Sequence, residues 1–157
     1  MNIFLLDQPT NIDSIVQAHC DKHVSKMILE SVQMLCTASW SSNVTAVYKP
    51  VHAKHPCTLW ASSSQENWLW LQELAIKLNE EFCWRYDRLA NHKSADVALS
   101  MSVPDTIPVS SDTPHPQCMP EQYKVDNNPV LAYRNYYLGE KHFAEWTKRE
   151  EPSWWLN

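Results

Sequence analysis

Apolar side chains recur with a helical period in three stretches of the chain. Residues 12–40, 63–90 and 128–148 each carry apolar side chains at a spacing close to 3.6 residues, the repeat of an α-helix. The pattern predicts an all-α fold. We expect a compact single-domain bundle of three long helices over residues 1–157, joined by long ordered loops.

Local start signals support two of these helices. Ser63 and Glu66 have the spacing of a capping box, and Asn128 before Pro129 is typical of a helix start. Between the helices, proline-containing stretches without an apolar period read as loops at 48–60 and 100–120. One short helical turn near Ala95 is expected just before the second loop.

Composition narrows the class of protein. One glycine among 157 residues leaves few positive-φ turn positions, which argues against a sheet-rich fold. The 44% hydrophobic and 20% charged residues indicate a soluble globular chain. Five cysteines without a CxxC spacing favour free thiols in a reducing compartment. With no secretory leader and no membrane span expected, we predict a cytoplasmic protein without a membrane partner.

The charge balance limits how the chain could contact nucleic acid. A formal net charge of −5 excludes a chain-wide positive field, so DNA binding would need a local basic patch. A small anionic ligand such as a nucleotide needs only a few cations in a pocket. The partner we expect is therefore DNA or a small nucleotide.

The densest candidate chemistry lies in the first predicted helix. His19, Lys22, His23, Lys26 and Glu30 fall on one stripe of a continuous helix. Two imidazoles interleaved with two ammonium groups repel one another when protonated, which suggests a site for an anion or for proton transfer. The alternative is an ordinary solvated face opposite the apolar residues.

The 48–60 loop offers a weak metal signal. His52, His55 and Cys57 lie within six residues, and His19 or His23 could complete a four-ligand zinc set. The spacing is not one of the common ligand pairs, and neighbouring lysines oppose a cation. We therefore predict no metal and no cofactor.

Several enzyme classes are excluded or left open by motif. A single glycine rules out Walker and Rossmann nucleotide motifs, and no GxSxG elbow is present. The loop lacks the glutamate and second cysteine of zinc deaminases. Nucleophilic catalysis by Cys20 or Cys57 stays open, although a helical Cys20 is expected to face the core.

Aromatic and basic residues are interleaved near the C-terminus. Arg134, Lys141 and Lys148 are spaced by seven, hence near one face of the third predicted helix. Cations meet phosphates while aromatic rings stack on bases, although tyrosines packed in the core would look the same. The residues expected to bind the ligand are His19, Lys54, His55, Trp60, Tyr133, Arg134, Tyr137, Lys141 and Trp154.

Four segments are spread along the chain: QAHCDKHVSKMILESVQMLCTA, HPCTLWASSSQENWLWL, MPEQYKV and NPVLAYRNYYLGEKHFAEWTKREEPSWW. With them, nearly the whole chain resembles a family of small tailed-phage proteins. A fainter resemblance extends to the phage pyrimidine-dimer DNA glycosylases, which are compact all-helical enzymes. It rests on the neighbourhood of Gln17 and His19, and on a C-terminal helix followed by Pro152, Ser153 and Trp154.

The resemblance to the glycosylases implies a mechanism. In that family the α-amino group of the chain attacks the deoxyribose C1′ and forms a Schiff base, assisted by a carboxylate on the first helix. Here Asn2 is large enough that Met1 should be retained, the position of the family glutamate holds Lys26, and Glu30 lies one turn later. The catalytic residues expected from this comparison are Met1, Lys22, His23, Lys26 and Glu30.

Two functions from different classes follow. The first is a DNA base-excision N-glycosylase/lyase that acts through an amine on deoxyribose. The alternative is a non-catalytic module that binds and sequesters a nucleotide, such as a host defence signal. In both, we expect the stripe of the first helix to form one cavity, roofed by the 48–60 loop and the C-terminal helix.

Overall fold

The computed structural model describes residues 2–40, 47–111 and 113–155, and within them the fold is all-α with no strand. The predicted fold class is confirmed at this level. The helices are α1 (Ile12–Ala18), α2 (Asp21–Ala38), α3 (Pro56–Ala61), α4 (Gln65–Arg85), α5 (Lys93–Ser100) and α6 (Pro129–Glu140), with one 3₁₀ helix, η1 (Glu121–Tyr123).

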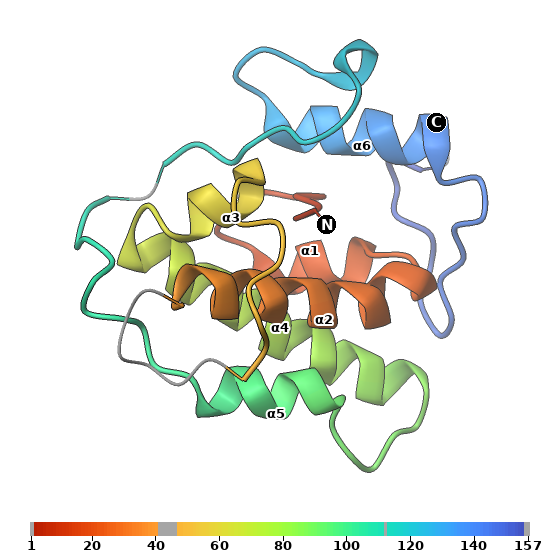
Figure 1. Cartoon of the computed structure of the whole chain (residues 1–157). Helices are drawn as coiled ribbons and strands as arrows, with labels where there is room; N and C mark the ends of the chain where they lie inside the picture. The colour runs from red at the N-terminus through yellow and green to blue at the C-terminus, as the bar shows by residue number, and fades with distance from the viewer. Residues whose placement is uncertain (1, 41–46, 112, 156–157) are drawn as a thin grey trace.

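Helices α2 and α4 lie side by side and form the packing core (Figure 1). Ile28 and Leu35 of α2 and Trp68 and Leu71 of α4 are fully buried, as their helical period predicts. Helices α1, α3 and α5 pack around this pair. The buried extended segment 3–6 runs between the core and α6.

The predicted helix over residues 12–40 is wrong as a continuous element. His19 and Cys20 have extended backbone angles and separate α1 from α2. The carbonyl groups left free at the end of α1 find buried donors, because Arg85 bonds the carbonyls of Gln17 and His19 while Trp146 Nε1 donates to Ala18. These distant side chains stabilise a break that local sequence does not indicate.

The prediction of a loop over residues 48–60 is also wrong in its last part, because α3 begins at Pro56. His55 is the N-cap of this helix: its Nδ1 accepts a hydrogen bond from the Cys57 amide at 3.2 Å, and Pro56 occupies the first turn. The short turn expected near Ala95 is confirmed as α5.

The other two long helices are confirmed with shorter ends. Ser64, rather than Ser63, caps α4 by accepting from the Asn67 amide at 3.1 Å. Asn128 caps α6 as predicted, but the helix ends at Glu140 instead of continuing to 148. Lys148 then lies outside α6 with a left-handed φ of 60°, so it does not share a helical face with Arg134.

No helix in the described part of the chain is both long and apolar enough to cross a membrane.

Candidate functional site

The residues of the predicted stripe divide between the core and the surface. His19 ends α1, whereas Lys22, His23, Lys26 and Glu30 belong to α2. Both histidines and the glutamate are buried, while the two lysines are exposed. The stripe is therefore not one uniform cationic face.

Burial keeps the two histidines neutral. The ring of His23 stacks on Phe4 at 4.4 Å between centroids, and its Nδ1 is hydrogen-bonded with the Tyr137 hydroxyl. Burial, reinforced by the ammonium groups of nearby lysines, lowers the pKa of His23 to about 3. His19 donates from Nδ1 to the Ile15 carbonyl, and burial lowers its pKa to about 4.

Three lysines surround this buried imidazole. The ammonium groups of Lys22, Lys26 and Lys141 each lower the pKa of His23, so all three lie within electrostatic range of it. Lys22 Nζ lies 4.2 Å from the centre of the Phe143 ring, and Lys141 Nζ lies 4.2 Å from that of Tyr136. Despite the acidic chain, this side of α2 carries a local basic patch.

Glu30 connects the basic patch to the start of the chain. Its Oε2 accepts a hydrogen bond from the Asn2 amide at 3.1 Å, and its Oε1 lies 3.4 Å from Lys26 Nζ. The carboxylate also borders a hollow of about 120 Å³ with His52. Met1, predicted to supply the reacting amine, lies outside the described residues.

The side chain of Asn2 is held on several sides. Its Nδ2 donates to the Cys118 carbonyl at 2.8 Å, and its Oδ1 lies 2.8 Å from the Tyr133 hydroxyl. That hydroxyl also accepts a bond from the Cys118 amide at 3.3 Å. Tyr133, predicted to contact a ligand, is fully buried and positions Asn2.

Two thiols and an imidazole complete the surroundings of Asn2. Ligand atoms of His55, Cys57 and Cys118 lie within 4.8 Å of one another, and the two sulfur atoms are 3.4 Å apart. The thiol of Cys57 donates to Cys118, which raises the pKa of Cys57 and lowers that of Cys118. We call the six residues that meet here the Asn2 cluster: Asn2, Glu30, His55, Cys57, Cys118 and Tyr133.

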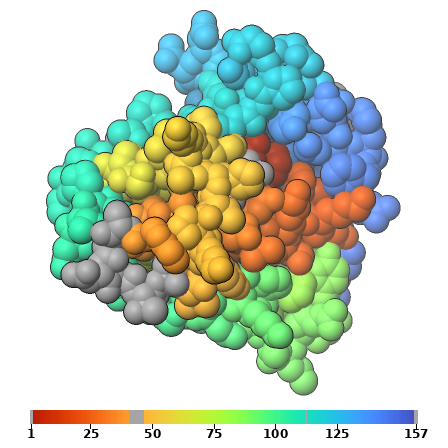
Figure 2. Space-filling model, in the orientation of Figure 1, coloured from red at the N-terminus to blue at the C-terminus, as the bar shows by residue number. Residues whose placement is uncertain are grey.

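Figure 2 shows that the N-terminal residues, coloured red, reach the surface between α2, the yellow segment around α3 and the blue C-terminal part. Sequence reasoning selected Glu30, His55 and Tyr133 but missed Asn2 and Cys118 as site residues. Asn2 lies 116 positions from Cys118, and no local pattern signals a contact of that range.

The remaining predicted residues lie elsewhere. Arg134 donates to the Leu6 carbonyl at 2.8 Å and lies over the Trp154 ring at 5.5 Å. Both border a separate hollow of about 520 Å³. Tyr137 is fully buried against His23, and Lys54 is exposed on the loop before α3.

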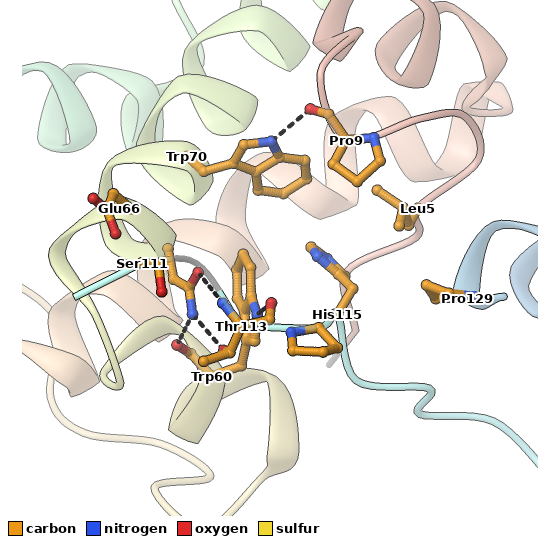
Figure 3. Close-up of a pocket in the computed structure, with 11 residues that line it drawn as sticks. Leu5, Pro9, Trp60, Glu66, Trp70, Ser111, Thr113, His115 and Pro129 are labelled. Carbon is orange, nitrogen blue, oxygen red and sulfur yellow. Dashed lines mark hydrogen bonds between the residues drawn. The ribbon is translucent and has the colours of Figure 1, made fainter. Parts of the chain in front are cut away.

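Trp60 lines an aromatic pocket of about 660 Å³ (Figure 3). Its ring lies 4.2 Å from His115 and 5.7 Å from Trp70, centroid to centroid, and Pro9 and Leu5 form another wall. Burial lowers the pKa of His115 to about 3, and its buried Nε2 has no hydrogen-bond partner among the described residues. None of the described residues lining this pocket is lysine or arginine.

No protein-family model, curated protein or solved structure matches this chain. Its function is therefore inferred from the residues and their geometry.

Proposed function

We propose that the chain is an amine-dependent DNA N-glycosylase/lyase that acts at the Asn2 cluster. The observation that carries this proposal is the 3.1 Å hydrogen bond from the Asn2 amide to the buried carboxylate of Glu30. An enzyme of this class needs a primary amine beside a carboxylate. The contact supports such a pair, because the start of the chain and an acidic side chain of α2 meet there.

Two amines are candidates for the nucleophile. Lys26 Nζ is 3.4 Å from Glu30 Oε1, and its side chain is 62% exposed, so a substrate can reach it. The second candidate is the α-amine of Met1, the residue directly before Asn2 in the sequence. Glu30 lies beside Lys26 and accepts a hydrogen bond from the Asn2 amide, so the proposal assigns its carboxylate a role with either amine.

The chemistry needs no metal or cofactor. The amine nitrogen bonds to C1′ while the bond from C1′ to the base breaks, and the base leaves with that electron pair. The attached nitrogen loses a proton, and opening of the C1′–O4′ bond then gives a protonated imine while O4′ takes up a proton. Glu30 would stabilise the cationic charge that develops at C1′.

The basic patch supports contact with the DNA backbone. Lys22, Lys26 and Lys141 lie around His23, and one of them, Lys26, also pairs with Glu30. Their charges can meet phosphates even though the chain as a whole is acidic. Binding through three cations should weaken as salt is added, and the logarithm of the binding constant should fall with the logarithm of the salt concentration with a slope of about −2.7 for duplex DNA.

Borohydride trapping tests the proposal. The chain is mixed with an oligonucleotide that contains an abasic site, because reduction of the imine fixes a covalent complex visible on a denaturing gel. Lys26→Ala is compared with Lys77→Ala, which removes another lysine paired with a glutamate, at 3.1 Å from Glu80. A third sample carries a chemically blocked α-amine.

The expected result is a trapped complex with the wild-type chain and with Lys77→Ala. Loss of trapping in Lys26→Ala identifies the lysine as the nucleophile, and loss after blocking the α-amine identifies Met1. If folded wild-type protein gives no complex on abasic or ultraviolet-damaged DNA, the glycosylase proposal is wrong.

The aromatic pocket favours a second function, that of a binding module for a planar ligand. Trp60, Trp70 and His115 present three rings, and the unpartnered Nε2 of His115 can pair with a polar edge. Without lysine or arginine among its described lining residues, the pocket suits an uncharged nucleobase or nucleoside better than a nucleotide phosphate.

Tryptophan fluorescence distinguishes this function. Titration with nucleosides should change the emission of the wild-type chain, and Trp70→Leu should abolish the change. Trp84→Leu is the matched control, because Trp84 is 46% exposed and packs against Arg149 at 4.2 Å, away from the pocket. Equal responses from both variants would remove the pocket as the binding site.

A further inference from the structure

Three side chains of the kinds that zinc prefers meet at the start of α3. His55 and Cys57 come from the first turn of that helix, and Cys118 comes from the segment before η1. One ligand atom from each lies within 4.8 Å of the others, with the two sulfurs 3.4 Å apart. Tetrahedral zinc holds such atoms roughly 3.4–3.8 Å from one another. Small side-chain movements would therefore complete the geometry.

The backbone that carries these side chains is already fixed. Cys57 is fully buried within α3. The Cys118 amide donates to the Tyr133 hydroxyl at 3.3 Å, and its carbonyl accepts from Asn2 at 2.8 Å. A site whose ligands are held before the ion arrives loses less conformational freedom on binding.

We propose that His55, Cys57 and Cys118 bind one soft divalent cation such as Zn²⁺. Two thiolates and an imidazole select zinc or cobalt over magnesium or calcium, which prefer oxygen ligands. Three protein ligands leave one tetrahedral position for water or another ligand. This site differs from the one considered from sequence, because Cys118, 61 residues away from Cys57, joins His55 and Cys57, whereas His52, His19 and His23 do not belong to the group.

Metal binding must alter one hydrogen bond. The Nδ1 atom of His55 accepts from the Cys57 amide, so the proton of the neutral ring lies on Nε2. A cation either takes the Nδ1 lone pair directly or binds Nε2 after the proton moves to Nδ1. In both cases Nδ1 can no longer accept the hydrogen bond that caps α3, and the two thiols release protons when the cation binds.

The metal itself is the probe. Co²⁺ is titrated into the reduced full-length chain, and thiolate-to-cobalt charge transfer is followed in the near ultraviolet together with the visible bands of tetrahedral cobalt. We expect one equivalent to bind and added Zn²⁺ to displace it. Bound Zn²⁺ should also protect Cys57 and Cys118 from air oxidation to a disulfide.

Matched variants separate ligands from bystanders. Cys57→Ser and Cys118→Ser should each lose most of the charge-transfer intensity and bind cobalt at least tenfold more weakly. His55→Asn removes the imidazole but keeps a side-chain oxygen suited to cap α3, so it should fold and also bind more weakly. Cys83→Ser removes a half-buried thiol outside the group and should bind as the wild type does.

The proposal is overturned if the reduced wild-type chain shows no thiolate-to-cobalt band. It is also overturned if the band survives in the Cys57→Ser, Cys118→Ser double variant, or if zinc leaves both thiols open to oxidation. None of these readouts depends on DNA, so the outcome is independent of the Schiff-base proposal.

Discussion

The Asn2 cluster and the charged group around Arg85 are both polar and buried or half-buried, but they use their bonding capacity differently. Arg85, 1% exposed, donates to Glu81, Asp21 and the carbonyls of Gln17 and His19. We call Asp21, Glu81, Arg85 and Arg149 the Arg85 network. Arg149 adds two further bonds to Glu81, at 2.9 and 2.8 Å.

This difference separates a structural group from a candidate site. In the Arg85 network charges of opposite sign satisfy one another, and little capacity is left for a ligand. In the Asn2 cluster two thiols and an imidazole lie close together, and a carboxylate borders a hollow. Groups that retain metal-binding or acid–base capacity are the ones that can take part in chemistry.

The largest effect is expected in the Arg85 network. Arg85→Met should lower the free energy of unfolding by about 3–5 kcal/mol, because two carboxylates and two carbonyls lose their buried partner. Urea unfolding measures the change. Arg88→Met, three residues further along at an exposed position, should stay within about 0.5 kcal/mol of the wild type. Equal losses in the two variants would mean that the network stabilises nothing.

The next largest effect concerns the Asn2 cluster. Glu30→Gln keeps the shape of the side chain and an oxygen for the Asn2 amide, but removes the negative charge. We expect the rate of borohydride trapping to fall at least about 100-fold, while the free energy of unfolding changes by about 1 kcal/mol or less. A variant that traps at the wild-type rate would show that the carboxylate has no role in the chemistry.

Acid should weaken the Arg85 network and the surroundings of the buried histidines His19, His23 and His115 in different pH ranges. Burial alone would raise the pKa of Glu81, but the bonds from Arg149 and Arg85 hold it below its usual value, so the network loses stability only as pH falls below the ordinary range for a carboxyl. The buried histidines bind protons in the unfolded chain from pH 6.5 downward but stay neutral when folded. Their contribution to stability is therefore present above pH 6.5 and is lost first.

His115 isolates that contribution, since burial alone lowers its pKa to about 3. His115→Phe keeps an aromatic ring in the pocket and removes the titrating group. Relative to the value at pH 7.5, the variant should retain about 2 kcal/mol more stability than the wild type at pH 5. Parallel curves of unfolding free energy against pH would contradict this.

The smallest effect calibrates the others. Ser64, the N-cap of α4, belongs to neither group, and Ser64→Ala should lower the free energy of unfolding by about 1 kcal/mol. Its trapping rate with abasic DNA should equal that of the wild type. A matching loss of trapping would show that modest destabilisation alone explains the result with Glu30→Gln.

The sequence predicted what depends on local pattern. The helical period of Trp68 and its neighbours anticipated α4, and Asn128 with Pro129 marked the start of α6. The break at His19 was not predicted, because its stabilising partners, Arg85 and Trp146, lie more than 60 positions further along the chain. Local propensity favours a continuous helix there, and tertiary bonds override it.

For the candidate site, too, the sequence pointed only to residues that stand in a local pattern. Glu30 and His55 were selected because they stand in dense local patterns of titratable residues. Cys118 lies in a proline-rich stretch with no such pattern, and Asn2 is a common residue near a chain start. Only folding brings Asn2 Nδ2 to 2.8 Å from the Cys118 carbonyl oxygen.

The anchoring of Asn2 has a consequence for the order of events during synthesis. Its partners Cys118 and Tyr133 are 116 and 131 positions away, so a ribosome releases Asn2 long before either of them. The cluster cannot assemble until Cys118 and Tyr133 have emerged, and contacts of such separation form slowly. A nascent or truncated chain that ends before Tyr133 would therefore carry every stripe residue of α2 and still lack the assembled site.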